Sequence, residues 1–134
     1  MEPIQLEPTT TTPRVIIDPV NNKFEISGES RPENTSKFFT PIVNWFSEYK
    51  SVLYYQKNSL GSSKKLSIDF KLDYFNSTSA KFILDIFFQL EKIKSEGYEA
   101  EVVWHYDNRD TDMKESGEEF SKLAPGVPVR FVGF

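Results

Sequence analysis

Hydrophobic and polar residues alternate most regularly between Leu66 and Phe75. The apolar positions in that stretch are Leu66, Ile68, Phe70, Leu72 and Tyr74. Polar residues stand between them up to Asp73. A repeat of two residues is the period of a β-strand with one buried face. We therefore expect a strand over 66–75, with Tyr74 on its buried side.

Shorter runs of the same kind predict the other strands. Val15–Ile17 and Phe24–Ser27 flank the turn-forming residues Asp18 to Asn22, a combination that indicates a β-hairpin. A further strand is expected over 101–107, where Val102, Trp104 and Tyr106 share one face. Residues 129–134 are expected to form a last strand at the edge of the sheet.

Apolar residues three and four apart predict two long helices. The first follows Ser30-Arg31-Pro32-Glu33, which has the composition of a capping box with Ser30 as N-cap. Because Pro41 lies inside its apolar pattern, we expect a kink or a restart there. A polar loop should follow over 56–65. The second helix is expected from about Ser79 to Ser95. Its apolar stripe is Ile83, Ile86, Phe87, Leu90 and Ile93.

A third, shorter helix is expected to be capped by Asp112 and Glu115 and to end near Leu123. The resulting element order, β-β-α-β-α-β-α with a last strand, predicts an α/β fold. We expect a single domain over 13–134, with a mixed β-sheet of four to five strands and about three helices mainly on one face. Residues 1–12, rich in Pro and Thr, are expected to be extended or mobile.

Composition excludes several classes of protein. The chain has no Cys, which rules out disulfides and cysteine metal sites and favours a reducing compartment. The first residues lack the basic and apolar regions of a secretory signal, and no run approaches the ~20 apolar residues of a membrane span. We therefore expect a cytoplasmic protein with no membrane insertion.

Charge argues against nucleic-acid binding. The net charge is −4, and the nearest approach to a basic patch is Lys57 with Lys64 and Lys65, interpreted as a solvated loop. No phosphate-binding glycine loop occurs, and we expect no cofactor. Asp107, Asp110 and Asp112 lack the spacing of a calcium loop, so we interpret them as caps and turn residues rather than a metal site.

The residues Asn76-Ser77-Thr78-Ser79 join the expected strand over 66–75 to the second helix. A helix N-terminus has free N–H groups and a partial positive charge, so it tolerates a phosphate on Ser77 or Thr78. Asn, Ser and Thr are also the ordinary N-cap residues. From the residues alone, phosphorylation and capping both stay open, and capping is the commoner use.

His105 is the only histidine in the chain. With a serine it could serve a small hydrolase, but the strand pattern places it opposite Val102 and Trp104, on a polar face or an edge. No catalytic residue is therefore predicted.

Several segments, taken in order, resemble the SiaC-type family of bacterial regulatory phosphoproteins. The matching pieces are Thr12-Pro13, Gly28-Glu29-Ser30-Arg31-Pro32-Glu33-Asn34, Pro41-Ile42 with Trp45, Tyr74-Phe75-Asn76-Ser77-Thr78-Ser79, Trp104-His105-Tyr106-Asp107 and Gly117-Glu118-Glu119-Phe120. They span about residues 4 to 124.

The resemblance implies a fold similar to that of the anti-sigma-factor antagonists, which is called STAS-like. It also implies a partner switch in which a Ser/Thr protein kinase and a metal-dependent phosphatase act on the protein. The unphosphorylated form of such proteins binds and activates a diguanylate cyclase, which links the switch to cyclic-di-GMP and biofilm behaviour.

The family's phosphoacceptor directly follows the Asn of an Asn-Thr-Ser-Ser pattern, a position that corresponds here to Ser77. This chain instead reads Asn-Ser-Thr-Ser, and the comparison with anti-sigma-factor antagonists favours Thr78. Ser77 is the preferred acceptor and Thr78 the alternative.

We further hypothesise that the starts of the first two helices form one partner-binding surface. Its predicted residues are Pro32, Glu33, Asn34, Tyr74, Asn76 and Ser79. The competing interpretation is a constitutive interaction domain in which these hydroxyls only cap a helix.

Overall fold

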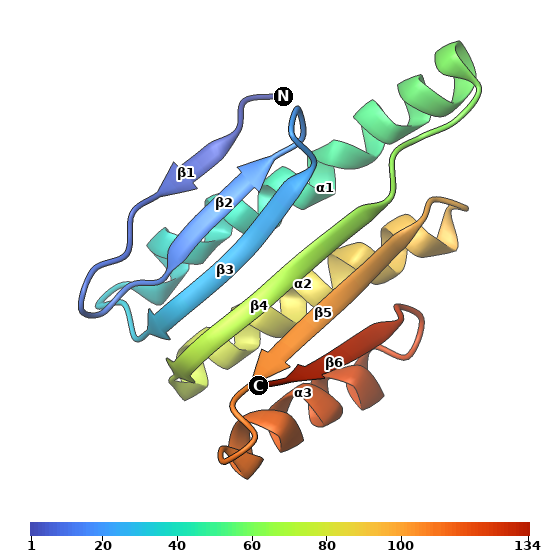
Figure 1. The fold of residues 1–134 in the computed structure, drawn as a ribbon. Coiled ribbons are helices and arrows are strands. Elements are labelled where there is room, and N and C mark those ends of the chain that lie inside the picture. Colours follow the sequence, from blue (N-terminus) through green and yellow to red (C-terminus); the bar gives the residue numbers. More distant parts are fainter.

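The computed structural model describes residues 1–134 and contains six strands and three helices (Figure 1). In chain order they are β1 (Ile4–Leu6), β2 (Arg14–Asp18), β3 (Lys23–Ser30), α1 (Thr35–Leu60), β4 (Leu66–Phe75), α2 (Ser77–Ser95), β5 (Ala100–Tyr106), α3 (Thr111–Leu123) and β6 (Val129–Gly133). The strands form one sheet in that same order.

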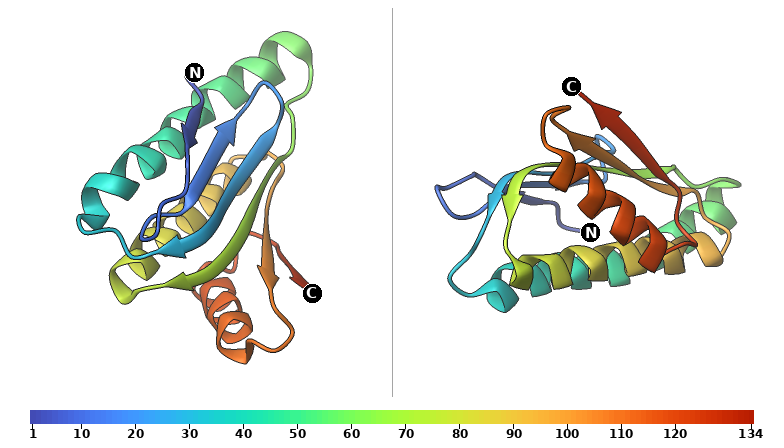
Figure 2. Two further views of the ribbon diagram at one scale, coloured as in Figure 1. Left: turned by 60° about the vertical axis from the view of Figure 1, so that its left-hand side comes forward. Right: turned by 90° about the horizontal axis from the view of Figure 1, so that it is seen from below.

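The sheet is mixed. The pairs β1–β2 and β2–β3 are antiparallel, whereas β3–β4, β4–β5 and β5–β6 are parallel. Parallel neighbours need a crossover connection, and α1, α2 and α3 supply the three crossovers. All three helices lie on the same side of the sheet and leave its other side uncovered (Figure 2). The predicted fold class is confirmed, with one or two more strands than expected.

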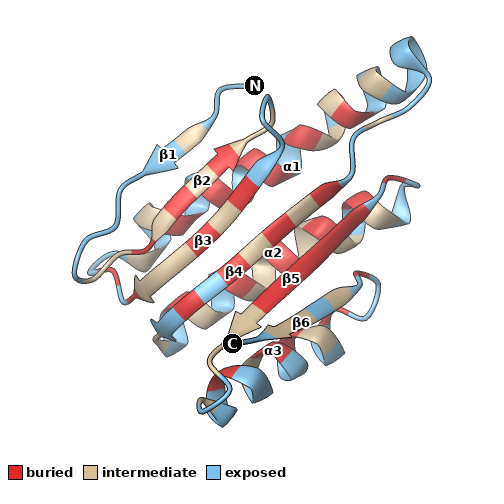
Figure 3. Cartoon of the chain, in the orientation of Figure 1, coloured by how far each residue is buried: buried red, intermediate tan, exposed pale blue.

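The core lies between the sheet and the helices and contains 27 buried apolar residues. The apolar stripe predicted for α2 is fully buried, and buried positions run along most of β5 (Figure 3). Trp104 of β5 packs against the rings of Phe70, Phe87 and Phe120 at centroid distances of 5.5, 6.1 and 5.6 Å. Its indole N–H donates to the carbonyl of Met113 over 2.9 Å, so this large side chain is buried without an unsatisfied donor.

The strand that sequence analysis did not predict is β1. It pairs with β2 inside the segment expected to be extended or mobile, with Ile4 opposite Ile17. The indole N–H of Trp45 in α1 donates to the carbonyl of Glu2 over 2.7 Å. This tertiary contact helps to hold the short edge strand in place. The strand has only three residues, which is too short for an alternation of apolar and polar residues to be recognised.

The first helix differs from its prediction at both ends. Ser30 is not the N-cap, because its backbone belongs to β3 and pairs with Phe75. The N-cap is Asn34, whose Oδ1 accepts from the N–H of Lys37 over 3.0 Å. The helix then runs without a restart through Pro41 to Leu60 and shortens the expected loop to 61–65. Gly61, with a φ of 85°, supplies the left-handed residue that ends it.

The starts of the other two helices also differ slightly from prediction. The second helix begins at Ser77 with Asn76 as N-cap, two residues before the expected start. The third begins at Thr111 and is capped by Asp110 rather than by Asp112 and Glu115. None of the three helices has the length and hydropathy needed to cross a membrane.

An irregularity near the end of β4 reverses the predicted sides of two aromatic residues. Gly28 pairs with Leu72 and Glu29 pairs with Tyr74, so Asp73 is an extra residue in β4. Beyond this bulge the alternation shifts by one position. Tyr74, predicted to be buried, is 49% exposed. The Phe75 ring instead packs against the rings of Trp104 and Phe120, at centroid distances of 6.3 and 5.8 Å.

This exchange predicts a large effect for one of two neighbouring substitutions and a small effect for the other. Phe75→Ala should lower the free energy of unfolding by about 3 kcal/mol, because it leaves a cavity beside Trp104. Tyr74→Ala should change it by no more than about 0.5 kcal/mol, because that ring faces solvent. Urea unfolding followed by circular dichroism measures both values. A larger loss for Tyr74→Ala than for Phe75→Ala would contradict the bulge.

Candidate functional site

The starts of α1 and α2 lie side by side at one end of the sheet (Figure 1). They meet there because β3 and β4 are parallel neighbours, so both strands end at the same edge. The backbone N–H of Asn76 donates to the carbonyl of Ser30 over 3.0 Å. The hydroxyl oxygens of Thr35 and Thr78 are 3.0 Å apart. The structure thus brings together the starts of the first two helices, the segments for which a common surface was predicted.

Beneath this surface two serines join the segments inside the protein. Ser30 Oγ donates to Ser79 Oγ over 2.9 Å, and Ser79 Oγ donates to the carbonyl of Ser30 over 3.1 Å. Both residues are fully buried. Since each hydroxyl has a partner, the pair avoids the free-energy cost of an unsatisfied buried polar group.

The two candidate phosphoacceptors have different surroundings. Both are exposed in the first turn of α2. Thr78 Oγ1 donates to the Asn76 side chain over 3.0 Å and lies next to Thr35. The hydroxyl of Thr35 also lies 3.5 Å from the carbonyl oxygen of Pro32, so both threonine hydroxyls have hydrogen-bond partners. The Ser77 hydroxyl has no hydrogen-bond partner within the protein, so its oxygen and proton are both free.

The surroundings of Ser77 are compatible with an added negative charge. Neither α1 nor α2 has an acidic residue in its first turn. Asn76 and Asn34 are neutral caps whose Oδ1 atoms each accept one backbone N–H. The two helix N-termini point to the same edge, and each contributes a partial positive charge. A phosphate on Ser77 would lie within the first turn of α2, where the attraction between the helix dipole and a negative charge is strongest.

The predicted partner-binding residues divide into accessible and buried ones. Glu33, Asn34 and Tyr74 are exposed, and Asn76 is half-buried. Pro32 and Ser79 are buried. Ser79 is therefore corrected from a contact residue to a positioning residue, because its side chain is fully used by Ser30. Thr35 was not among the predicted residues, although it directly follows the N-cap Asn34 and contacts Thr78.

A shallow groove adjoins this surface along α1. Its volume is about 540 Å³, and Glu33 and Asn34 line it together with mostly apolar surface from β1 and α1. The apolar lining residues are Ile4, Leu6, Phe38 and Ile42, with Pro32 and Pro41. The accessible polar residues near Ser77 are thus continuous with an apolar surface of the kind that protein interfaces use.

The other candidate sites of the sequence have structural roles. His105 Nε2 lies 2.8 Å from Asp69 Oδ1 on the uncovered side of the sheet, with no serine hydroxyl bonded to it. Hydrogen bonds from the Arg109 side chain and backbone lower the pKa of Asp107 to about 2. Asp110 caps α3. No group of three or more potential metal ligands occurs.

Comparison with known proteins agrees with the fold and with the sequence resemblance. A relative from Pseudomonas aeruginosa strain UCBPP-PA14, an uncharacterized protein, is 28% identical over 120 residues, which is 90% of this chain and 88% of the relative. The crystal structure of apo-SiaC from Pseudomonas aeruginosa matches with a TM-score of 0.83 at 26% identity, covering 98% of this chain and 99% of that one.

A second solved structure is similar as well, the crystal structure of the diguanylate cyclase SiaD in complex with its activator SiaC from Pseudomonas aeruginosa. The match covers 98% of this chain and 99% of the matching chain. Its TM-score is 0.84 at 25% identity. The family model described as SiaC family regulatory phosphoprotein matches residues 6–134. This match covers nearly the whole chain, including both helix starts, and the chain belongs to the SiaC family of regulatory phosphoproteins.

Proposed function

We propose that this protein is a phosphorylation-controlled binding protein of a partner-switch signalling system and not itself an enzyme. Its substrate hydroxyl is Ser77, and its unphosphorylated form binds and activates a diguanylate cyclase. Family membership and the full-length similarity to the SiaC of the SiaD complex support the class of partner. The proposed setting is the cytoplasm, where cyclic-di-GMP signals act on processes such as biofilm formation.

The observation that carries the proposal is the state of the Ser77 hydroxyl. It is exposed, unbonded and placed directly after the N-cap Asn76. A kinase needs access to the acceptor oxygen and must remove its proton. Thr78 meets these needs less well, because its proton is held by Asn76 and its oxygen is shared with Thr35. This difference supports Ser77 over Thr78 independently of the family pattern.

Phosphorylation would act on a surface made by two helices at once. A phosphate adds about −1.5 to −2 charge. The contact between Thr35 and Thr78 keeps the start of α1 close to the start of α2. The added charge would therefore also act on a partner bound to Glu33, Asn34 and the adjoining groove. A partner suited to the neutral surface would lose affinity through repulsion and through the cost of desolvating the phosphate.

We assign the addition of phosphate to a dedicated Ser/Thr protein kinase and its removal to a metal-dependent phosphatase. These two partners follow from the family pattern around Asn76 and Ser77. Ser77 is exposed in the first turn of α2, which suits both enzymes because each has to reach the oxygen of its side chain.

The acceptor can be identified on protein isolated from its native cells. Intact-mass and peptide mass spectrometry should find a single phosphate on Ser77 that phosphatase treatment removes. Ser77→Ala should abolish the phosphate, whereas Thr78→Ala should keep it. Ser36→Ala, which removes an exposed hydroxyl in the first turn of α1, is the matched control and should change nothing. A phosphate on Thr78 would reverse the assignment. No phosphate under any growth condition would favour a constitutive interaction domain.

The shared surface can be tested by adding one negative charge to either helix. Asn34→Asp and Ser77→Asp should each weaken binding to the cyclase or the kinase by about tenfold, since both positions face the proposed partner. Isothermal titration calorimetry with the purified partner measures this. Asn44→Asp, which adds the same charge at an exposed position further along α1, is the control and should stay within about twofold. Unchanged affinity in both test variants would refute the shared surface.

A further inference from the structure

The far end of α1 carries a feature that the proposed switch does not use. The helix has 26 residues, so it is about 39 Å long. Its last turns project past the end of the sheet opposite Ser77 (Figures 1 and 2). The ten residues of β4 separate the two ends by about 30 Å. A surface at this end is therefore separate from the two helix starts.

The segment that forms this end is basic in an acidic protein. Between Glu48 and Asp69 the sequence contains four lysines and no carboxylate, although the whole chain has a net charge of −4. Lys50 lies 3.7 Å from Glu96, and Lys65 lies 3.1 Å from Glu101. Lys57 and Lys64 form no ion pair within 4.0 Å. Two ammonium groups on the same projection are thus available to a negatively charged ligand.

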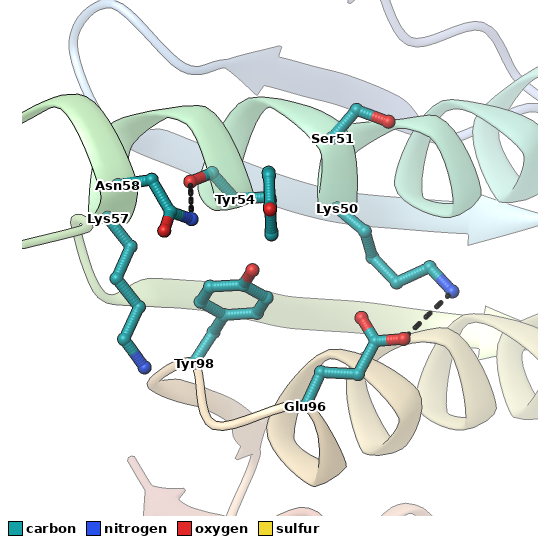
Figure 4. Close-up of a pocket in the computed structure, with 7 residues that line it drawn as sticks. All are labelled: Lys50, Ser51, Tyr54, Lys57, Asn58, Glu96 and Tyr98. Carbon is teal, nitrogen blue, oxygen red and sulfur yellow. Dashed lines mark hydrogen bonds and ion pairs between the residues drawn. The ribbon is translucent and has the colours of Figure 1, made fainter.

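A cleft of about 640 Å³ opens beside Lys50 and Lys57, between α1 and the turn that follows α2 (Figure 4). It is lined by Lys50, Ser51, Tyr54, Lys57, Asn58, Glu96 and Tyr98. Lys50 and Glu96 border one side of it and Lys57 borders the other, with the two tyrosines between them (Figure 4). The Lys57 ammonium lies 5.5 Å from the centre of the Tyr98 ring. The cleft thus combines positive charge, hydroxyl groups and aromatic surface.

The same projection exposes large apolar side chains. Tyr54 is 64% exposed, Tyr55 is 65% exposed and Leu60 is 73% exposed. Tyrosine is among the residues that contribute most to protein–protein binding energy. These side chains leave the core because the helix continues beyond the sheet. The projection therefore offers contact area for a partner next to the unpaired lysines.

The character of the cleft favours a polypeptide over other ligands. Small-molecule pockets are mostly apolar and enclose their ligand, whereas this cleft is open and only its two tyrosines are hydrophobic. Strong binding to a nucleic acid needs several cations on its phosphates, and only Lys57 and Lys64 are unpaired here. An acidic polypeptide supplies carboxylates for two lysines and apolar groups for the tyrosines.

We propose that the end of α1 is a second interaction surface, which binds an acidic segment of a partner protein. Lys57 and Lys64 pair with carboxylates of that segment, and Tyr54 packs against its apolar groups. Lys64 is held near the helix because its backbone N–H donates to the Gln56 side chain over 3.3 Å. The surface goes beyond the switch at Ser77 and does not depend on its phosphorylation.

The test uses the full-length protein and a fluorescein-labelled peptide of alternating glutamate and tyrosine as probe, with binding followed by fluorescence anisotropy at low salt. The double variant Lys57→Gln/Lys64→Gln should weaken binding by about tenfold, and Tyr54→Ala by about threefold. The matched control is Lys23→Gln/Lys122→Gln, which removes the same charge from exposed lysines elsewhere. It should stay within about twofold.

Three results would overturn the proposal. The first is equal loss in the test and control variants, which would show an effect of net charge alone. The second is unchanged binding in Lys57→Gln/Lys64→Gln. The third is tighter binding of labelled oligothymidylate or of phosphatidylserine vesicles through the same lysines, which would assign the surface to a nucleic acid or a membrane. Ser77→Ala should bind the peptide normally, so failure here and failure of the switch are distinguishable.

Discussion

A buried contact between two serines holds the candidate surface together. Ser30 ends β3 and Ser79 lies in the first turn of α2, 49 positions later in the chain, yet their hydroxyls are 2.9 Å apart inside the protein. The backbone bond from Asn76 to Ser30 lies beside them. Because a buried hydroxyl without a partner costs about 1–3 kcal/mol, separation of the two segments is unfavourable. This contact holds the end of β3, which leads into α1, against the start of α2.

Local backbone irregularity then decides which residues reach the surface. The extra residue Asp73 in β4 turns Tyr74 into solvent and Phe75 onto Trp104. In a regular strand the tyrosine would be buried, and the end of β4 would offer a partner little aromatic area. The bulge lies just before Asn76, the residue that caps α2.

The length of α1 gives the molecule two chemically different ends. At its start are the neutral cap Asn34 and an apolar groove, beside the first turn of α2 that carries the unbonded hydroxyl of Ser77. At its other end are unpaired lysines and exposed tyrosines that project past the sheet. A regulatory protein with more than one partner benefits from such a separation, because occupation of one end leaves the other accessible.

The sequence by itself determined the strong periodic elements, the fold class and the position of the hydroxyl-rich turn after Asn76. The strand over 66–75, the stripe of α2 and the hydroxyls after Asn76 are local patterns set by side-chain type and spacing. Only the tertiary structure decided the rest. Ser30 became a strand residue because β4 pairs with it, Ile4–Leu6 became a strand through β2, and Ser79 became a buried support rather than a contact. These outcomes depend on hydrogen bonds and packing between residues far apart in the chain, which no local pattern encodes.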